Sequence, residues 1–269
     1  MSDQPTVLLH VDGAAATIEL NRPETMNAWN RRFGEELLAA VERCATDEAI
    51  RAVMVTGAGR GFSSGADLRS FGQPGEVELT PEGRPDLRQV LEERYHPIIR
   101  GLRTMPKPVV AAINGPCVGI GMSLALACDL LVAAESSYFL LAFVNIGLVP
   151  DGGSSLFVPT RVGMARAAEL ALLGERLPAR QALEWGLVNR VVADDALREE
   201  AGALVARLAA GPTASYAGAK RQLNAWLYDR MEQQLELEAA IQQEMAATQD
   251  FVEGATAFAQ RRQPAFGGR

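Results

Sequence analysis

Two glycine-rich turns, each of which follows an apolar run typical of a β-strand, constrain the fold of this chain most strongly. The first turn spans residues 59–67 and follows the run at 52–56, and the second spans 114–121 and follows the run at 109–113. Each turn is expected to lead into an apolar helix, whose first backbone N–H groups have no partner within the helix. Glycine lets a ligand approach such a backbone closely. Two such turns facing one point would stabilise a developing oxyanion, which predicts chemistry on a carbonyl or a thioester.

Composition limits the classes to which the chain can belong. With 269 residues, 48% of them hydrophobic, it can bury a sizeable core as one large domain or as one domain with an appendage. The formal charge of −7 comes from interspersed acids and bases, which argues against a nucleic-acid partner. Three scattered cysteines and two distant histidines predict neither a disulfide framework nor a metal site.

The sequence also argues against a membrane protein. No basic stretch followed by an apolar one marks a signal peptide at the N-terminus. The longest apolar stretch, 122–134, is interrupted by Asp129 and is shorter than the about 20 residues that a bilayer span needs. We therefore expect a cytoplasmic protein with no membrane partner.

The order of the elements predicts an α/β architecture in which helices cover a sheet. Apolar periodicity and turn residues predict strands at 6–9, 16–20, 52–56, 109–113 and 130–133, and helices at 30–46, 87–104 and 121–128. Residues 73–86, rich in proline, glycine and glutamate, are expected to form a mobile surface loop or lid. Beyond about residue 193 only helices are predicted, at 196–209, 215–228 and 233–248.

Several motifs occur in an order that resembles a known family. They are Gly-Phe-Ser-Ser-Gly-Ala-Asp-Leu at 61–68, Pro-Lys-Pro-Val-Val-Ala-Ala-Ile-Asn-Gly at 106–115, Ala-Cys-Asp at 127–129, Ile-Gly-Leu-Val-Pro at 146–150, Ala-Leu-Glu-Trp-Gly-Leu-Val at 182–188, and Ala-Thr-Ala-Phe at 255–258 followed by Arg261. Together they resemble the crotonase superfamily, which has the enoyl-CoA hydratase/isomerase fold. The likeness covers nearly the whole chain.

The resemblance implies a spiral of ββα units with a helical C-terminal region. Residues 1–195 would form the core that binds acyl-CoA and carries out catalysis, and residues 196–269 would form the helical trimerisation region. A homotrimer or a dimer of trimers is the implied assembly. The implied substrate is an acyl-CoA thioester, so coenzyme A enters as part of the substrate and no cofactor is bound permanently.

The family's binding residues can be carried over by position. The backbone N–H groups of Ala66 and Ile120 would form the oxyanion hole for the thioester oxygen. Ala28 and Ser64, beside Ala66, would lie near the adenine of CoA.

The C-terminal motif adds two residues to the CoA site. Phe258 and Arg261 would approach CoA from a neighbouring subunit. Arg261, which precedes Arg262, suits a phosphate electrostatically. The alternative for Phe258 is a helix residue that packs in the core.

The chain departs from the family's hydratases, which use two glutamates. Ser123 and Phe143 stand at those two positions. Neither side chain can move a proton as a carboxylate does, so simple hydration of a double bond is disfavoured. Ser123 and Phe143 are instead expected to line the acyl pocket.

Asp151 is the candidate acid/base. It follows Pro150, at a position that resembles the acid of the Δ3,Δ2-enoyl-CoA isomerases and of the ring-opened phenylacetyl-CoA isomerases. One carboxylate is sufficient for a 1,3-proton shift, and an apolar pocket would raise its pKa. The alternative is that Asp151 caps a helix running through Ser154 and Ser155.

Other functions remain open at this stage. The 4-chlorobenzoyl-CoA dehalogenases carry a nucleophilic aspartate and a basic histidine that align with Asp151 and His96, but they have tryptophan at the place of Phe143. His96 would otherwise line the acyl pocket or serve a structural role. Hydratase or hydrolytic activity through Asp151 or His96 and a non-catalytic acyl-CoA binding protein are the further alternatives.

Overall fold

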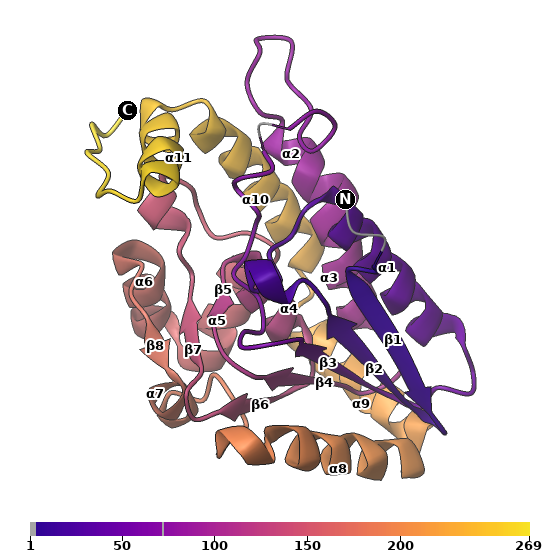
Figure 1. Cartoon of the computed structure of the whole chain (residues 1–269). Helices are drawn as coiled ribbons and strands as arrows, with labels where there is room; N and C mark the ends of the chain where they lie inside the picture. Colours follow the sequence, from indigo (N-terminus) through magenta and orange to yellow (C-terminus); the bar gives the residue numbers. More distant parts are fainter. Residues whose placement is uncertain (1–3, 72) are drawn as a thin grey trace.

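The computed structural model describes residues 4–71 and 73–269, which form two β-sheets surrounded by helices (Figure 1). The larger sheet has the strand order β1-β2-β3-β4-β6-β9. These strands are β1 Val7–Asp12, β2 Ala15–Leu20, β3 Ala52–Gly57, β4 Val109–Ile113, β6 Leu130–Ala134 and β9 Arg190–Val192. β1 and β2 form the antiparallel hairpin that the sequence predicts, and every later neighbour pairs in parallel. The expected α/β class is confirmed.

The larger sheet is covered on both faces, which explains why its central strands are apolar throughout. In β4, Val109, Ala111 and Ile113 belong to the main core, whereas Val110 and Ala112 face a second core on the other side. Helices α1 Arg31–Thr46, α3 His96–Thr104 and α4 Ile120–Ala127 contribute to the main core. Helix α8 Leu197–Ala210 covers the opposite face and lies beneath β3, β4 and β6 in Figure 1.

A second, three-stranded sheet lies beside the second glycine-rich turn. It consists of β5 Cys117–Val118, β7 Tyr138–Leu140 and β8 Leu177–Pro178, and it was not predicted. Strands of two or three residues leave too little periodicity to recognise in a sequence. The connecting segments include the 3-10 turn Phe143–Ile146 and helices α5 Ser154–Val162, α6 Met164–Leu173 and α7 Ala179–Glu184.

The C-terminal helices pack onto the core from several sides. After the 3-10 turn Asp194–Ala196 and α8 come α9 Thr213–Leu227, α10 Met231–Ala246 and α11 Gln249–Gln260. The three helices predicted here are confirmed to within two residues at each end, whereas α11 was not predicted. α10 packs against α2 Leu87–Val90 and α5, and α11 packs against the turn at 143–146.

The helix predicted over 87–104 is interrupted. It is built from α2, a π-helical segment Leu91–Tyr95 and α3. Pro97 lies in the first turn of α3 and has no backbone N–H, so the regular hydrogen-bond pattern cannot continue through this point. Single π-turns of this kind are frequent at functional sites.

The first glycine-rich turn does not lead into a helix, contrary to expectation. Beyond Ala66 the chain makes successive turns, in which the Ser70 N–H donates to the carbonyl of Asp67. Residues 73–86 then form a loop with no helix or strand, tied to the start of α1 because the Arg31 N–H donates to Glu76 at 2.9 Å. The mobility of this loop stays a prediction.

Within the described ranges, no helix combines the length and the apolarity that a membrane span requires. Over those same residues, no group of three or more His, Cys, Asp or Glu side chains offers a metal site.

Candidate active site

The two glycine-rich turns meet, as their sequences predict. Ser63 pairs with Cys117 in a parallel bridge, and the Val118 N–H donates to the carbonyl of Ser63 at 2.9 Å. Gly65 and Gly119 follow at φ +90° and +53°, in the left-handed region that favours glycine. A Cβ at Gly65 would lie 3.1 Å from the Val118 carbonyl, so the close approach of the two turns also requires a residue without a side chain.

Ala66 and Ile120, which follow these two glycines, both line one cavity. Trp29 donates to the carbonyl of Gly65 and accepts from the N–H of Asp67, which turns the intervening Ala66 N–H away from Trp29. Ile120 begins α4, so its N–H has no acceptor within the helix. Among the described residues, neither N–H makes a hydrogen bond.

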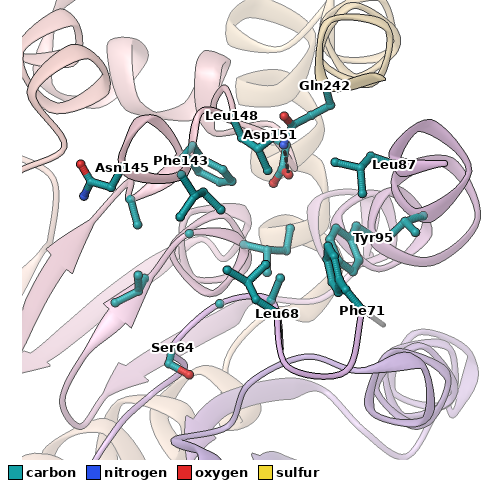
Figure 2. Close-up of a pocket in the computed structure, with 18 of the residues that line it drawn as sticks. Ser64, Leu68, Phe71, Leu87, Tyr95, Phe143, Asn145, Leu148, Asp151 and Gln242 are labelled. Atoms are coloured by element: carbon teal, nitrogen blue, oxygen red, sulfur yellow. Dashed lines mark hydrogen bonds between the residues drawn. The ribbon is translucent and has the colours of Figure 1, made fainter. Parts of the chain in front are cut away.

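The donors border a cavity of about 270 Å³ with a largely apolar wall (Figure 2). The wall combines residues of the two turns, of the α2–π–α3 helix, of the segment 140–151 and of the C-terminal helices. Its described members are Ser64, Gly65, Ala66, Leu68, Phe71, Leu87, Val90, Leu91, Tyr95, Val118, Gly119, Ile120, Leu140, Ala142, Phe143, Asn145, Ile146, Leu148, Asp151, Gln242 and Phe258. Asp151 carries the only carboxyl group in this set.

Asp151 is held with one oxygen bound and one oxygen unbound. Its side chain is buried, and Oδ2 accepts a hydrogen bond from Nε2 of Gln242 at 2.9 Å. Oδ1 has no hydrogen-bond partner among the described residues. Burial raises the pKa of Asp151 to about 8, against the opposing effect of the Gln242 hydrogen bond, and the nearby Glu238 carboxyl raises it further. The raised pKa predicted from the apolar surroundings is confirmed.

The backbone of Asp151 is fixed by two serines. Oγ of Ser123 donates to the Asp151 carbonyl at 2.7 Å, and Oγ of Ser154 donates to the same oxygen at 2.8 Å. Gly152 follows at φ +60°, where a Cβ would lie 2.5 Å from Cδ1 of Ile120. Ser123 is not among the described lining residues, which corrects its expected place in the acyl pocket. Its hydroxyl instead binds the backbone of Asp151.

Glu238, rather than the Asp151 side chain, caps the helix that follows. It accepts hydrogen bonds from the N–H groups of Gly153, at 2.7 Å, and Ser155, at 3.1 Å, at the N-terminus of α5. Burial raises the pKa of Glu238 to about 7. The capping alternative for Asp151 is thus wrong.

The remaining predicted site residues divide into two groups. Ser64, Phe143 and Phe258 line the cavity, whereas Ala28 and Arg261 lie outside the lining set. Phe258 lines the cavity of its own chain, where α11 packs against the turn at 143–146. Its approach to CoA from a neighbouring subunit stays a prediction.

His96 is outside the lining set as well, which corrects its placement in the acyl pocket. The preceding Tyr95 faces the cavity, while His96 is buried and its Nε2 has no partner among the described residues. Burial, helped by the charge of Arg100, lowers the pKa of His96 to about 4. The imidazole is therefore neutral at physiological pH.

Comparison with known proteins identifies the family of this chain. Residues 11–269 match the family model described as Enoyl-CoA hydratase/isomerase. The chain belongs to this family. The resemblance to the crotonase superfamily is confirmed.

Relatives of this family member cover almost its whole length. It is 39% identical over 264 residues to a 1,2-epoxyphenylacetyl-CoA isomerase of Escherichia coli, with 98% of each chain covered. It is 41% identical over 264 residues to a probable enoyl-CoA hydratase of Rhodobacter capsulatus, also with 98% of each chain covered. The crystal structure of an enoyl-CoA hydratase from Mycobacterium avium subsp. paratuberculosis superposes with a TM-score of 0.87 at 38% identity, over 97% of this chain and 98% of that one. The crotonase-type fold is thereby confirmed.

Proposed function

We propose that this member of the family is an acyl-CoA isomerase that converts 3-enoyl-CoA to 2-enoyl-CoA, with Asp151 as the single acid/base. One observation carries the proposal. Asp151 carries the only carboxyl group among the described cavity residues, and its Oδ1 is unbound. Ala66 and Ile120, whose backbone N–H groups have no hydrogen-bond acceptor among the described residues, line the same cavity.

The reaction follows from these groups. The thioester oxygen accepts hydrogen bonds from the N–H groups of Ala66 and Ile120. Ionised Asp151 takes a proton from C2, and the electron pair of the broken C–H bond delocalises over the C3=C4 bond and the thioester to give a dienolate. The two N–H groups stabilise the charge that develops on the thioester oxygen. Protonated Asp151 then returns the proton to C4, which leaves a C2=C3 double bond.

The raised pKa of Asp151 suits both half-reactions. A carboxylate with a pKa near 8 is a stronger base toward C2 than an ordinary aspartate. The acid formed is still able to protonate C4, because its pKa lies near the working pH. Burial of the carboxyl group slows exchange of the carried proton with water.

The absence of a second carboxylate disfavours hydration. Water addition needs one group to activate water and another to protonate the α-carbon. Ser123 stands where the family's first glutamate stands, and its hydroxyl is committed to the Asp151 carbonyl; Phe143, at the second position, is an apolar part of the wall. A dehalogenase-type reaction is disfavoured because His96 is not among the described residues of the cavity wall. The relative named as an isomerase is consistent with the proposal.

We place the CoA part of the substrate at the end of the cavity marked by Ser64, across from Gln242 in Figure 2. Ala28, Ser64 and Ala66 would contact it along the first turn. Phe258 and Arg261 would contact it from α11. Arg262 is paired with Glu253, at 2.8 Å for the longer contact, whereas the Arg261 guanidinium has no acidic partner in the described parts of the chain and is available to a phosphate.

We further propose a homotrimer or a dimer of trimers in which the C-terminal helices form contacts. The support is a set of large apolar side chains that a single chain leaves in water. Trp226 is 82% exposed on α9, and Val252 is 63% exposed on α11. Sedimentation equilibrium tests this assembly, because a mass equal to one 28.9-kDa chain would contradict it.

Substitution of Asp151 tests the catalytic role. Asp151→Asn keeps the size and the acceptor for Gln242 but cannot carry a proton, so turnover of a 3-enoyl-CoA should fall by about 10²–10⁴-fold. Binding of hexanoyl-CoA, a saturated probe measured by calorimetry, should change little. A variant that isomerises at the wild-type rate would overturn the assignment. A wild-type protein that binds hexanoyl-CoA and turns over no enoyl thioester would instead support the binding-only alternative.

A further inference from the structure

Helix α10 contributes a buried amide to the cavity from a part of the chain far from the glycine-rich turns. Gln242 is 1% exposed, and its side chain contacts the segment 149–151 at two points. Its Oε1 accepts from the Val149 N–H at 3.2 Å, and its Nε2 donates to Oδ2 of Asp151 at 2.9 Å. Figure 2 shows the Gln242 amide above the Asp151 carboxyl group.

The orientation of this amide follows from hydrogen-bond chemistry. A backbone N–H can only donate, so the Gln242 oxygen must face Val149. The amide nitrogen then faces Asp151 and donates to it. A flipped amide would place N–H against N–H and a carbonyl against a carboxylate, which loses both bonds. The backbone at Val149 therefore makes Gln242 a fixed donor to Asp151.

We propose that Gln242 is the positioning residue of the acid/base: by binding Oδ2, it holds the Asp151 carboxyl in one orientation and makes Oδ1 the oxygen that moves the proton. This inference rests on the proposed function of Asp151. Without Gln242, the carboxyl group could rotate, and its two oxygens would compete for the substrate proton.

Gln242 also favours the ionised form of Asp151, whereas the other surroundings of Asp151 favour the neutral acid. Burial favours the neutral acid, and so does the Glu238 carboxyl, which lies one turn away on α10. Burial raises the pKa of the phenol of Tyr95, from the π-helical segment, and the charge of the nearby Asp151 carboxylate raises it further. The Gln242 hydrogen bond is the influence that lowers the pKa of Asp151, because it binds the charged form.

The helix itself is anchored by other contacts, so the role of Gln242 can be separated from folding. Glu238 caps α5, and Oε1 of Gln243 accepts from the N–H of Arg88 at 3.1 Å at the start of α2. Nε2 of Gln243 donates to the carbonyl of Pro85 at 3.3 Å. Gln243 is thus a matched control: it is the next residue, with an equivalent amide that binds backbone rather than Asp151.

The experiment compares Gln242→Met, Gln242→Glu and the control Gln243→Met with the wild-type protein. For each, kcat and KM for trans-3-hexenoyl-CoA are measured between pH 6 and pH 9.5, with the melting temperature as a check on folding. Gln242→Met should lower kcat by about ten- to a hundredfold with little change in KM, because a hydrogen bond to a charged group is lost. The apparent pKa of kcat/KM should rise.

The second variant keeps the test decisive if the first does not fold. Gln242→Glu retains the shape and the acceptor for Val149 but places a second carboxyl against Asp151, so its apparent pKa should rise further than that of Gln242→Met. Gln243→Met should keep the wild-type apparent pKa. A wild-type pH profile and kcat in either folded Gln242 variant, with Asp151→Asn inactive, would overturn this inference and leave the proposed function standing. Full activity in Asp151→Asn would overturn both.

Discussion

At the scale of single residues, the raised pKa of Asp151 links catalysis to stability. Burial raises this pKa from an ordinary value of 3.8 to about 8, so between these pH values the folded protein binds a proton that the unfolded chain releases. By linkage, the contribution of Asp151 to stability falls as pH rises through this window and stays low above it. The asparagine of Asp151→Asn does not titrate. The melting temperature of this variant should therefore increase relative to that of the wild type as the pH rises from 5 to 8.5.

Scanning calorimetry of both proteins at several pH values measures this difference. The rise of the Glu238 pKa to about 7 affects both proteins alike and cancels in the comparison. Melting temperatures that stay parallel across the range would show that Asp151 titrates normally in the folded state.

The sequence predicts only part of this site. Asp151 could be found from its place after Pro150, and its apolar neighbours predict the direction of its pKa shift. Gln242 could not, because it reaches Asp151 across 91 residues from an amphipathic helix. A buried glutamine on such a helix has the same sequence pattern as one at the surface. Glu238, which was also missed, contacts Gly153 across 85 residues.

At the scale of elements, the turn after Asp151 links the proposed acid/base to Ile120, one of the two proposed oxyanion donors. Gly152 has φ +60°, and a Cβ there would lie 2.5 Å from Cδ1 of Ile120 and 3.0 Å from Cβ of Ser123. Gly152→Ala should therefore displace Ile120 or Asp151 and lower kcat by about 10²-fold, the cost of a shift near 1 Å in an active site.

Steady-state kinetics measure this effect, and Gly202→Ala is its control. Gly202 lies in α8 with an ordinary φ, and a Cβ there would meet nothing within 4 Å. That substitution should keep kcat and stabilise the helix by roughly 1 kcal/mol. Equal kcat values for Gly152→Ala and the wild type would contradict the coupling.

The elements that could be predicted are those with long, uniform periodicity. The strands at 52–57 and 109–113 are mostly apolar and buried throughout, and α1 carries Phe33, Leu37 and Val41 at helical spacing. The π-helical segment within the wall was missed because its sequence has the periodicity of an ordinary helix and only Pro97 marks the break. The helix expected after the first turn was wrong because proline and glycine follow it.

At the scale of the whole molecule, the cavity is assembled from segments that are distant in the chain. The two glycine-rich turns contribute the proposed donors, the segment at 140–151 contributes the proposed acid/base, and α10 and α11 contribute Gln242 and Phe258 to the lining. The motif order reveals the family and hence the fold, whereas the contribution of Phe258 to the cavity wall follows only from how the C-terminal helices pack. A single reaction at this composite site therefore tests the proposed function.

That reaction can be observed directly by incubating the protein with trans-3-hexenoyl-CoA in D2O and following the products by NMR and mass spectrometry. We predict conversion to trans-2-hexenoyl-CoA with no 3-hydroxyhexanoyl-CoA. The described cavity wall holds one carboxylate, which can shift a proton, and no second carboxylate that could activate water. Formation of the 3-hydroxy thioester, or recovery of the 3-enoyl thioester unchanged, would contradict the proposed function.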